Sequence, residues 1–174
     1  VGLGLPRAGR VGIYLEKRVE TVVASFGAPA GGGVFVPMNP LLKPEQVGFI
    51  AQDCGVQILV TSPERLATLG PTLATCPALR HVVLTDKPAQ LPELPPHVSV
   101  LGWAELLASA PAAGHRVIDT DMVAILYTSG STGRPKGVMH THTNLVASAI
   151  AYAAAIGLNE ETVALVSSPM FHVG

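Results

Sequence analysis

Strand-like and helix-like patterns alternate along almost the whole chain, and this alternation limits the folds that are open to it. Short runs rich in β-branched and aliphatic residues are typical of buried strands. Between them lie segments whose apolar residues recur three and four positions apart, as in helices. This order favours an α/β fold with a largely parallel sheet flanked by helices. The predicted strands are 11–15, 34–36, 56–61, 81–85, 123–128, 137–140 and 163–167.

Glycine and proline mark the ends of the predicted helices. The helix predicted over 18–30 stops at three consecutive glycines. Pro44 suits the first turn of the next helix, and Gly55 ends it. The apolar faces that we expect to be buried are Val19, Val22, Val23, Phe26 and Ala30 in the first helix, and Val47, Ile50, Ala51 and Cys54 in the second. Further helices are predicted over 63–75, 103–110 and 144–156, and the four prolines of 87–98 predict an extended surface connection.

The charge of the chain is low and unevenly distributed. Charged residues make up 13% of the chain, against a usual share of about 25%. The net charge of −1 argues against nucleic acid as the main partner. Residues 137–159 carry no Asp, Glu, Lys or Arg, so we expect the helix over 144–156 to be buried on most of its faces, against another part of this chain or against sequence that is missing from it. The apolar run 145–156 is too short to span a membrane, which takes about 20 residues, so no integral membrane segment is predicted.

The two cysteines and the chain ends carry two further expectations. Cys54 and Cys76 form no CxxC motif and have no clustered histidines, so we interpret them as reduced, buried residues of a cytoplasmic protein. The chain begins at Val1 rather than Met and ends directly after an apolar run. We therefore expect it to be a fragment of a longer protein.

The stretch LYTSGSTGRPKGV, residues 126–138, places many small hydrogen-bond donors and two cations in one loop. Backbone N–H groups in a glycine-rich turn can converge on an anion, because no Cβ atom blocks their approach. Lys136 adds a mobile positive charge that can reach phosphate oxygens. The loop therefore predicts a phosphate-binding site over 128–137. Arg134 can contact phosphate or point to solvent, since the residue before a proline is held extended.

A Walker A loop is excluded by the residues around Lys136. That motif requires a glycine before the lysine and a Ser or Thr after it. Here Pro135 precedes Lys136 and Gly137 follows it. Proline has no backbone N–H to offer phosphate, and no hydroxyl occupies the magnesium position. His140 and His142 lie beyond the loop without a clustered carboxylate or cysteine, so capping or packing roles are predicted for them rather than metal binding.

Three segments together resemble the AMP-forming (adenylate-forming) acyl-CoA synthetase and ligase family. The loop YTSGSTGRPKGV, residues 127–138, is similar to the signature loop of that family. GGGVFVPMNP at 31–40 resembles its Gly-x-Val-x-Val-Pro-x-x-Pro segment, and SPMFHVG at 168–174 resembles its Pro-x-Phe-His-x-x-Gly segment. The resemblance implies that residues 1–174 are part of the large N-terminal AMP-binding domain of an adenylate-forming enzyme, with its C-terminal domain absent.

The resemblance also implies a reaction and a set of site residues. A carboxylic acid, expected to be fatty or aryl, attacks the α-phosphate of ATP to give an acyl-adenylate and pyrophosphate, and the thiol of CoA then displaces AMP. Mg²⁺ would bridge phosphate oxygens, with no protein metal ligand assigned. Lys136 and His172 are the implied catalytic residues. The residues implied to bind the β- and γ-phosphates are Thr128, Ser129, Gly130, Ser131, Thr132, Gly133, Lys136 and Gly137.

The later family segments are missing from this sequence, including the Tyr-Gly-x-Thr-Glu stretch and the C-terminal catalytic lysine. We therefore expect the chain alone not to turn over ATP. Three alternatives stay open at this point: a non-catalytic nucleotide- or pyrophosphate-binding module, a peptide-synthetase adenylation domain that transfers its acyl group to a carrier protein, and a structural remnant.

Overall fold

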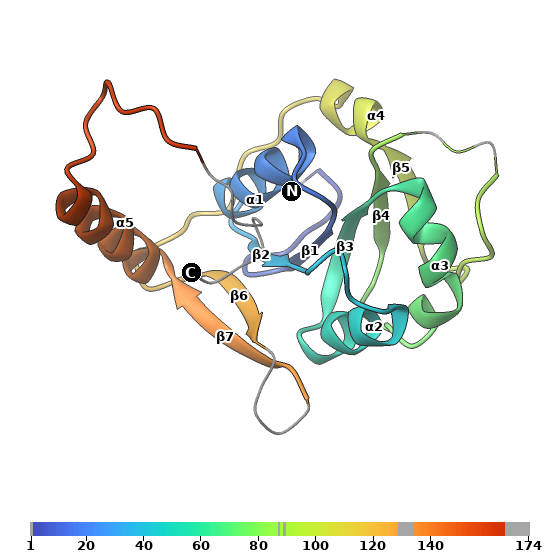
Figure 1. Ribbon diagram of the computed structural model, residues 1–174. Coiled ribbons are helices and arrows are strands. Elements are labelled where there is room, and N and C mark those ends of the chain that lie inside the picture. Colours follow the sequence, from blue (N-terminus) through green and yellow to red (C-terminus); the bar gives the residue numbers. More distant parts are fainter. Residues whose placement is uncertain (1, 87, 89, 129–133, 166–174) are drawn as a thin grey trace.

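The computed structural model describes residues 2–86, 88, 90–128 and 134–165. These residues form a seven-stranded sheet with helices on both faces (Figure 1). The strand order is β5-β4-β3-β1-β2-β6-β7, and every neighbouring pair is parallel except β6 and β7. The predicted α/β architecture is therefore confirmed.

The strands are β1 (Arg10–Tyr14), β2 (Val34–Pro37), β3 (Val56–Thr61), β4 (His81–Leu84), β5 (Ser99–Gly102), β6 (Met122–Thr128) and β7 (Lys136–Thr141). The helices are α1 (Val19–Ala30), α2 (Pro44–Asp53), α3 (Pro63–Leu73), α4 (Trp103–Ala108) and α5 (His142–Ile156).

The core consists of two apolar clusters, one on each face of the sheet. Alternate residues of a strand point to opposite faces, so Ile13 belongs to one cluster and Tyr14 to the other. The first cluster packs under α2 and α3 and includes Val47, Ile50, Leu66, Leu69 and Leu73. The second lies under α1 and α4 and includes Val11, Ala24, Ile58 and Val60, with the partly buried Trp103 and Leu106 packed against it.

Strand β3 keeps this alternation in spite of one irregularity. Arg10 lies opposite Val56, but the next residue of β1, Val11, lies opposite Ile58. Gln57 is therefore an extra residue, a β-bulge. The bulge lets Val56 and Leu59 face the first cluster while Ile58 and Val60 face the second.

The prediction of which face the first helix buries is wrong. The five residues Val19, Val22, Val23, Phe26 and Ala30 are all exposed in α1, and Phe26 keeps 75% of its surface accessible. The helix instead buries Thr21, Ala24 and Pro29. Small residues on the inner face let α1 approach β1 and β2 closely, and this leaves its larger apolar side chains outside. The prediction for α2 is confirmed at Val47, Ile50 and Ala51, while Cys54 is half-buried.

The predictions for the last third of the chain also need correction. Helix α5 buries none of its residues, so burial of this helix against the described part of the chain is wrong. Figure 1 shows it standing apart from the helices that cover the sheet. The strand predicted over 163–167 is wrong for 163–165, which have no regular structure; residues 166 and 167 lie outside the described residues. None of the described helices combines the length and the apolar character that crossing a membrane requires.

No helix forms in the described part of the proline-rich connection, residues 88 and 90–98. The strand after it, β5, was not predicted. Its residues are half-buried or exposed, because it lies at the edge of the sheet next to β4. A short edge strand carries a weaker apolar pattern than a central strand, and this explains why the sequence pattern did not reveal it.

Replacing Leu69 by Ala should strongly destabilise the chain. Leu69 is fully buried between α3 and the sheet, and such truncations cost about 2–5 kcal/mol. Leu107→Ala is the matched control, because Leu107 is largely exposed, and it should change the free energy of unfolding by less than about 0.5 kcal/mol. Urea unfolding measures both values. Equal losses in the two variants would contradict the described core.

Candidate functional site

The predicted phosphate-binding loop connects β6 to β7. These strands form the one antiparallel pair of the described sheet, with Thr128 opposite Lys136 and Tyr127 opposite Gly137. Thr128, Lys136 and Gly137 are therefore strand residues at the two stems of the connection, and all three are exposed. The structure brings these three predicted site residues together. The others, Ser129, Gly130, Ser131, Thr132, Gly133 and His172, lie outside the described residues.

A side chain at the stem residue Gly137 would require neighbouring side chains to move. A Cβ atom built at this position would lie 2.7 Å from Ile125 Cγ2 and 3.1 Å from Tyr127 Cζ. The ring of Tyr127 occupies this space and packs across the facing strand. Glycine at 137 therefore allows the Tyr127 ring to lie over both stems of the connection.

The hydroxyl of Tyr127 reaches a different part of the fold. It donates a hydrogen bond of 2.5 Å to Oδ2 of Asp53, the last residue of α2. Partial burial, followed by this hydrogen bond to a carboxylate, holds the pKa of Tyr127 well above its usual range. The phenol therefore stays protonated and acts as a donor at neutral pH.

The opposite end of the β6–β7 pair is held by Asp121, which directly precedes β6. Arg7 donates from Nη2 to both carboxylate oxygens of Asp121, at 2.6 and 2.7 Å. The hydrogen bond from Arg7 holds the pKa of Asp121 below its usual range. The backbone carbonyl of Asp121 also accepts from the N–H of His142, the first residue of α5. One residue thus joins the N-terminal segment, β6 and α5.

The comparisons with known proteins agree with the motifs. The family model described as AMP-binding enzyme matches residues 1–174. The chain belongs to the AMP-binding enzyme family. It is 32% identical over 174 residues to the long-chain-fatty-acid–CoA ligase FadD13 of Mycobacterium tuberculosis, covering 98% of this chain and 32% of the relative. It is also 32% identical over 177 residues to the crotonobetaine/carnitine–CoA ligase of Escherichia coli strain SE11, covering 98% of this chain and 33% of the relative.

A solved structure supports the same family. The anthranilate CoA ligase AuaEII, crystallised with anthranoyl-AMP, superposes with a TM-score of 0.75 at 26% identity, covering 88% of this chain and 29% of that one. The chain spans about a third of the length of the curated relatives named above. The resemblance to adenylate-forming acyl-CoA ligases is thus confirmed for the family and the fold.

Two contact residues next to the family loop were not singled out from the sequence. Tyr127 stands inside the quoted motif, directly before Thr128, so its position was visible although its role was not. Asp53 carried no signal, because it is 74 positions away from Tyr127 along the chain. Only the fold brings the end of α2 against the hairpin.

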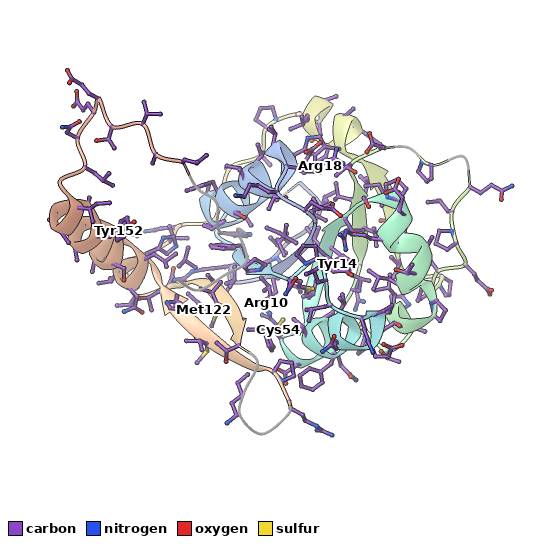
Figure 2. The ribbon with its side chains drawn as sticks, viewed as in Figure 1. Arg10, Tyr14, Arg18, Cys54, Met122 and Tyr152 are labelled. Atoms are coloured by element: carbon purple, nitrogen blue, oxygen red, sulfur yellow. The ribbon has the colours of Figure 1, made fainter. Side chains whose placement is uncertain are left out.

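Cys54 lies beside this contact but is not suited to be a nucleophile. Burial raises the pKa of its thiol to about 11, so the reactive thiolate is scarce at neutral pH. Its carbonyl accepts a 2.6 Å hydrogen bond from Nε of Arg10 in β1. Figure 2 shows Arg10 and Cys54 next to each other. Cys54 and Cys76 are both free cysteines, as predicted.

The histidines near the hairpin do not form a metal site with other side chains of the described part. His140 lies in β7 and His142 opens α5, whose N-cap is Thr141 rather than either histidine. The Nε2 atoms of both histidines are buried and have no hydrogen-bond partner. Within the described residues no group of three His, Cys, Asp or Glu side chains could hold a metal ion. Mg²⁺ bound to ATP usually needs only one or two carboxylates besides the substrate phosphates, so this finding concerns protein metal clusters and not the Mg²⁺ that the resemblance implies.

Alkylation of Cys54 should be slow. A thiol with a pKa of about 11 holds about a hundredfold less thiolate at pH 8 than one at the ordinary value of 9.0. In a Cys76→Ala background, iodoacetamide labelling of Cys54 at pH 8 should therefore run about a hundredfold slower than labelling of an unfolded control in urea. Mass spectrometry of the intact chain measures the rate. Labelling at the same rate in both conditions would show that the thiol is not shielded.

Proposed function

We propose that the complete polypeptide that carries this chain is an AMP-forming acid–thiol ligase, as its relatives' names and its loop both suggest. A carboxylate oxygen of the acid bonds to the α-phosphorus of ATP, and the bond from that phosphorus to the bridging oxygen breaks, releasing pyrophosphate. The CoA thiol then attacks the acyl carbonyl carbon and AMP leaves. The proton of the CoA thiol passes to solvent or to a base, and the product is an acyl-CoA thioester.

The observation that carries this proposal is the exposed lysine at the stem of the loop. Lys136 lies in β7 directly opposite Thr128, so its charge is held at one end of the connection that contains Ser129–Gly133. We assign these residues, with Gly137, to the β- and γ-phosphates of ATP. The lysine would stabilise the negative charge that builds up on the departing pyrophosphate, which is electrostatic catalysis. His172 is assigned to the region of the acyl group and the α-phosphate.

The acid and the thiol are proposed from the printed names of relatives. The long-chain-fatty-acid–CoA ligase and the anthranilate CoA ligase represent fatty and aryl acids, and we propose an acid of one of these two classes. Both names specify CoA, which favours CoA over a carrier protein as the acceptor. The two free cysteines fit a reducing compartment, and we propose the cytoplasm.

Exchange of labelled pyrophosphate into ATP tests the first half-reaction. The complete polypeptide should catalyse this exchange only when a fatty or aryl acid is present. Lys136→Ala should lower the rate about 10²-fold, since removing one group that stabilises developing charge has an effect of this size. Lys43→Ala is the control, because Lys43 is an exposed lysine at the start of α2, outside the loop; it should leave the rate within about twofold.

The outcomes of this assay separate the alternatives. Acid-dependent exchange followed by CoA-dependent release of AMP supports the ligase. Exchange without any response to CoA favours the peptide-synthetase alternative, and ATP binding without exchange favours the binding module. The same assay on residues 1–174 alone tests the prediction that this chain by itself does not turn over ATP.

A further inference from the structure

The hairpin that carries the loop pairs with the parallel sheet over a short length, although the first half of β6 is buried in the core. A single register pair, Phe35 opposite Ala124, links β2 to β6. Strand β6 continues to Thr128 beyond that pair, and its remaining strand pairing is with β7. Figure 1 shows the β6–β7 hairpin projecting from the sheet. Strand hydrogen bonds alone therefore do not fix the loop stems relative to the core.

One side chain joins the stems to a rigid element of the core. Tyr127 donates its hydroxyl to Asp53 Oδ2 at 2.5 Å. Asp53 ends α2, a helix that is held in the first core cluster by Val47 and Ile50, both fully buried. A contact to such a helix restricts the hairpin in a way that a contact to a surface loop would not.

The same side chain contacts both stems. Tyr127 directly precedes Thr128 in β6, and its ring lies against the position of Gly137, which directly follows Lys136 in β7. The space over Gly137 exists because this residue has no Cβ atom. The ring thus fixes the two stems relative to each other, and the hydroxyl fixes them relative to α2.

We propose that Tyr127 and Asp53 are positioning residues for the phosphate-binding loop. They do not touch ATP. They hold Thr128 and Lys136 where the loop can receive the triphosphate, so part of the ordering cost of ATP binding is met before ATP arrives. We call the hydrogen bond between Tyr127 and Asp53 the tether. The inference rests on the proposed function for its substrate, ATP, but the tether itself is a contact of the hairpin that exists without ATP.

Removal of the tether should weaken ATP binding more than it slows the chemistry. In the complete polypeptide, Tyr127→Phe should raise the KM for ATP about fivefold, the size expected for one partly exposed hydrogen bond. The kcat should stay within about twofold, because the groups that act on the transition state are retained. Asp53→Ala should have the same effect. The double variant should be no worse than either single variant, since both remove one interaction.

Tyr14→Phe is the matched control for a merely structural effect. Tyr14 is buried, and its hydroxyl donates a 2.9 Å hydrogen bond to the carbonyl of Leu42, away from the hairpin. This variant also loses a tyrosine hydroxyl bond, but its KM for ATP should equal that of the wild type. An unchanged KM in Tyr127→Phe, or an equal rise in Tyr14→Phe, would overturn the proposal.

A second readout needs no enzyme activity. Trypsin can cleave after Lys136, in the stem, and the rate of cleavage at this bond reports how often the stem opens. Tyr127→Phe and Asp53→Ala should both speed this cleavage about fivefold, and Tyr14→Phe should not. Far-UV circular dichroism checks that each variant is folded. If the wild type lacks acid-dependent exchange, the proposed function fails while the cleavage rates still decide whether the tether exists; equal rates in all variants would refute it.

Discussion

Burial of both faces of the central strands is the constraint on which the rest of the structure depends. A parallel sheet needs apolar cover on each side, because helices must cross over both faces to connect its strands. In β1 the buried residues Ile13 and Tyr14 face opposite clusters, so this strand lies at the centre of the core. The bulge at Gln57 preserves the same arrangement in β3. The β6–β7 hairpin is attached to this core, so the position of its stems depends on the position of the core strands.

The strands were predicted best where both faces are buried. The run 56–61 matches β3 at both ends, since a strand buried on both sides shows a continuous apolar pattern that needs no knowledge of its partners. Helix α1 was predicted as an element, but its inner face was not. Its apolar residues occupy more than one side, and the side that faces the sheet was decided by the small residues Thr21 and Ala24. A pattern of apolar residues cannot reveal which side of a helix allows it to approach the sheet more closely.

The candidate site was predictable to the extent that it is contiguous in sequence. The motif around Lys136 predicts a loop and a ligand chemistry, and of these the structure shows the stems of the loop, with Lys136 opposite Thr128. The contact between Tyr127 and Asp53 was not predictable, because it joins two elements that meet only after the sheet has formed. Contacts of this kind depend on topology, and local patterns contain no information about them.

An antiparallel hairpin whose stems end in exposed residues is a suitable place for a loop that is proposed to bind a polyphosphate. The loop needs free backbone donors, and a connection buried in the parallel sheet would have no room for a ligand. The exposed stem residues lack packing that would order them, although Tyr127 beside them packs against the first core cluster, and ordering these residues on binding costs affinity. Two contacts offset this cost at opposite ends of the hairpin: Arg7 holds Asp121 where β6 begins, and Asp53 holds Tyr127 where it ends. The stems of the hairpin can then stay fixed to the core before any ligand binds.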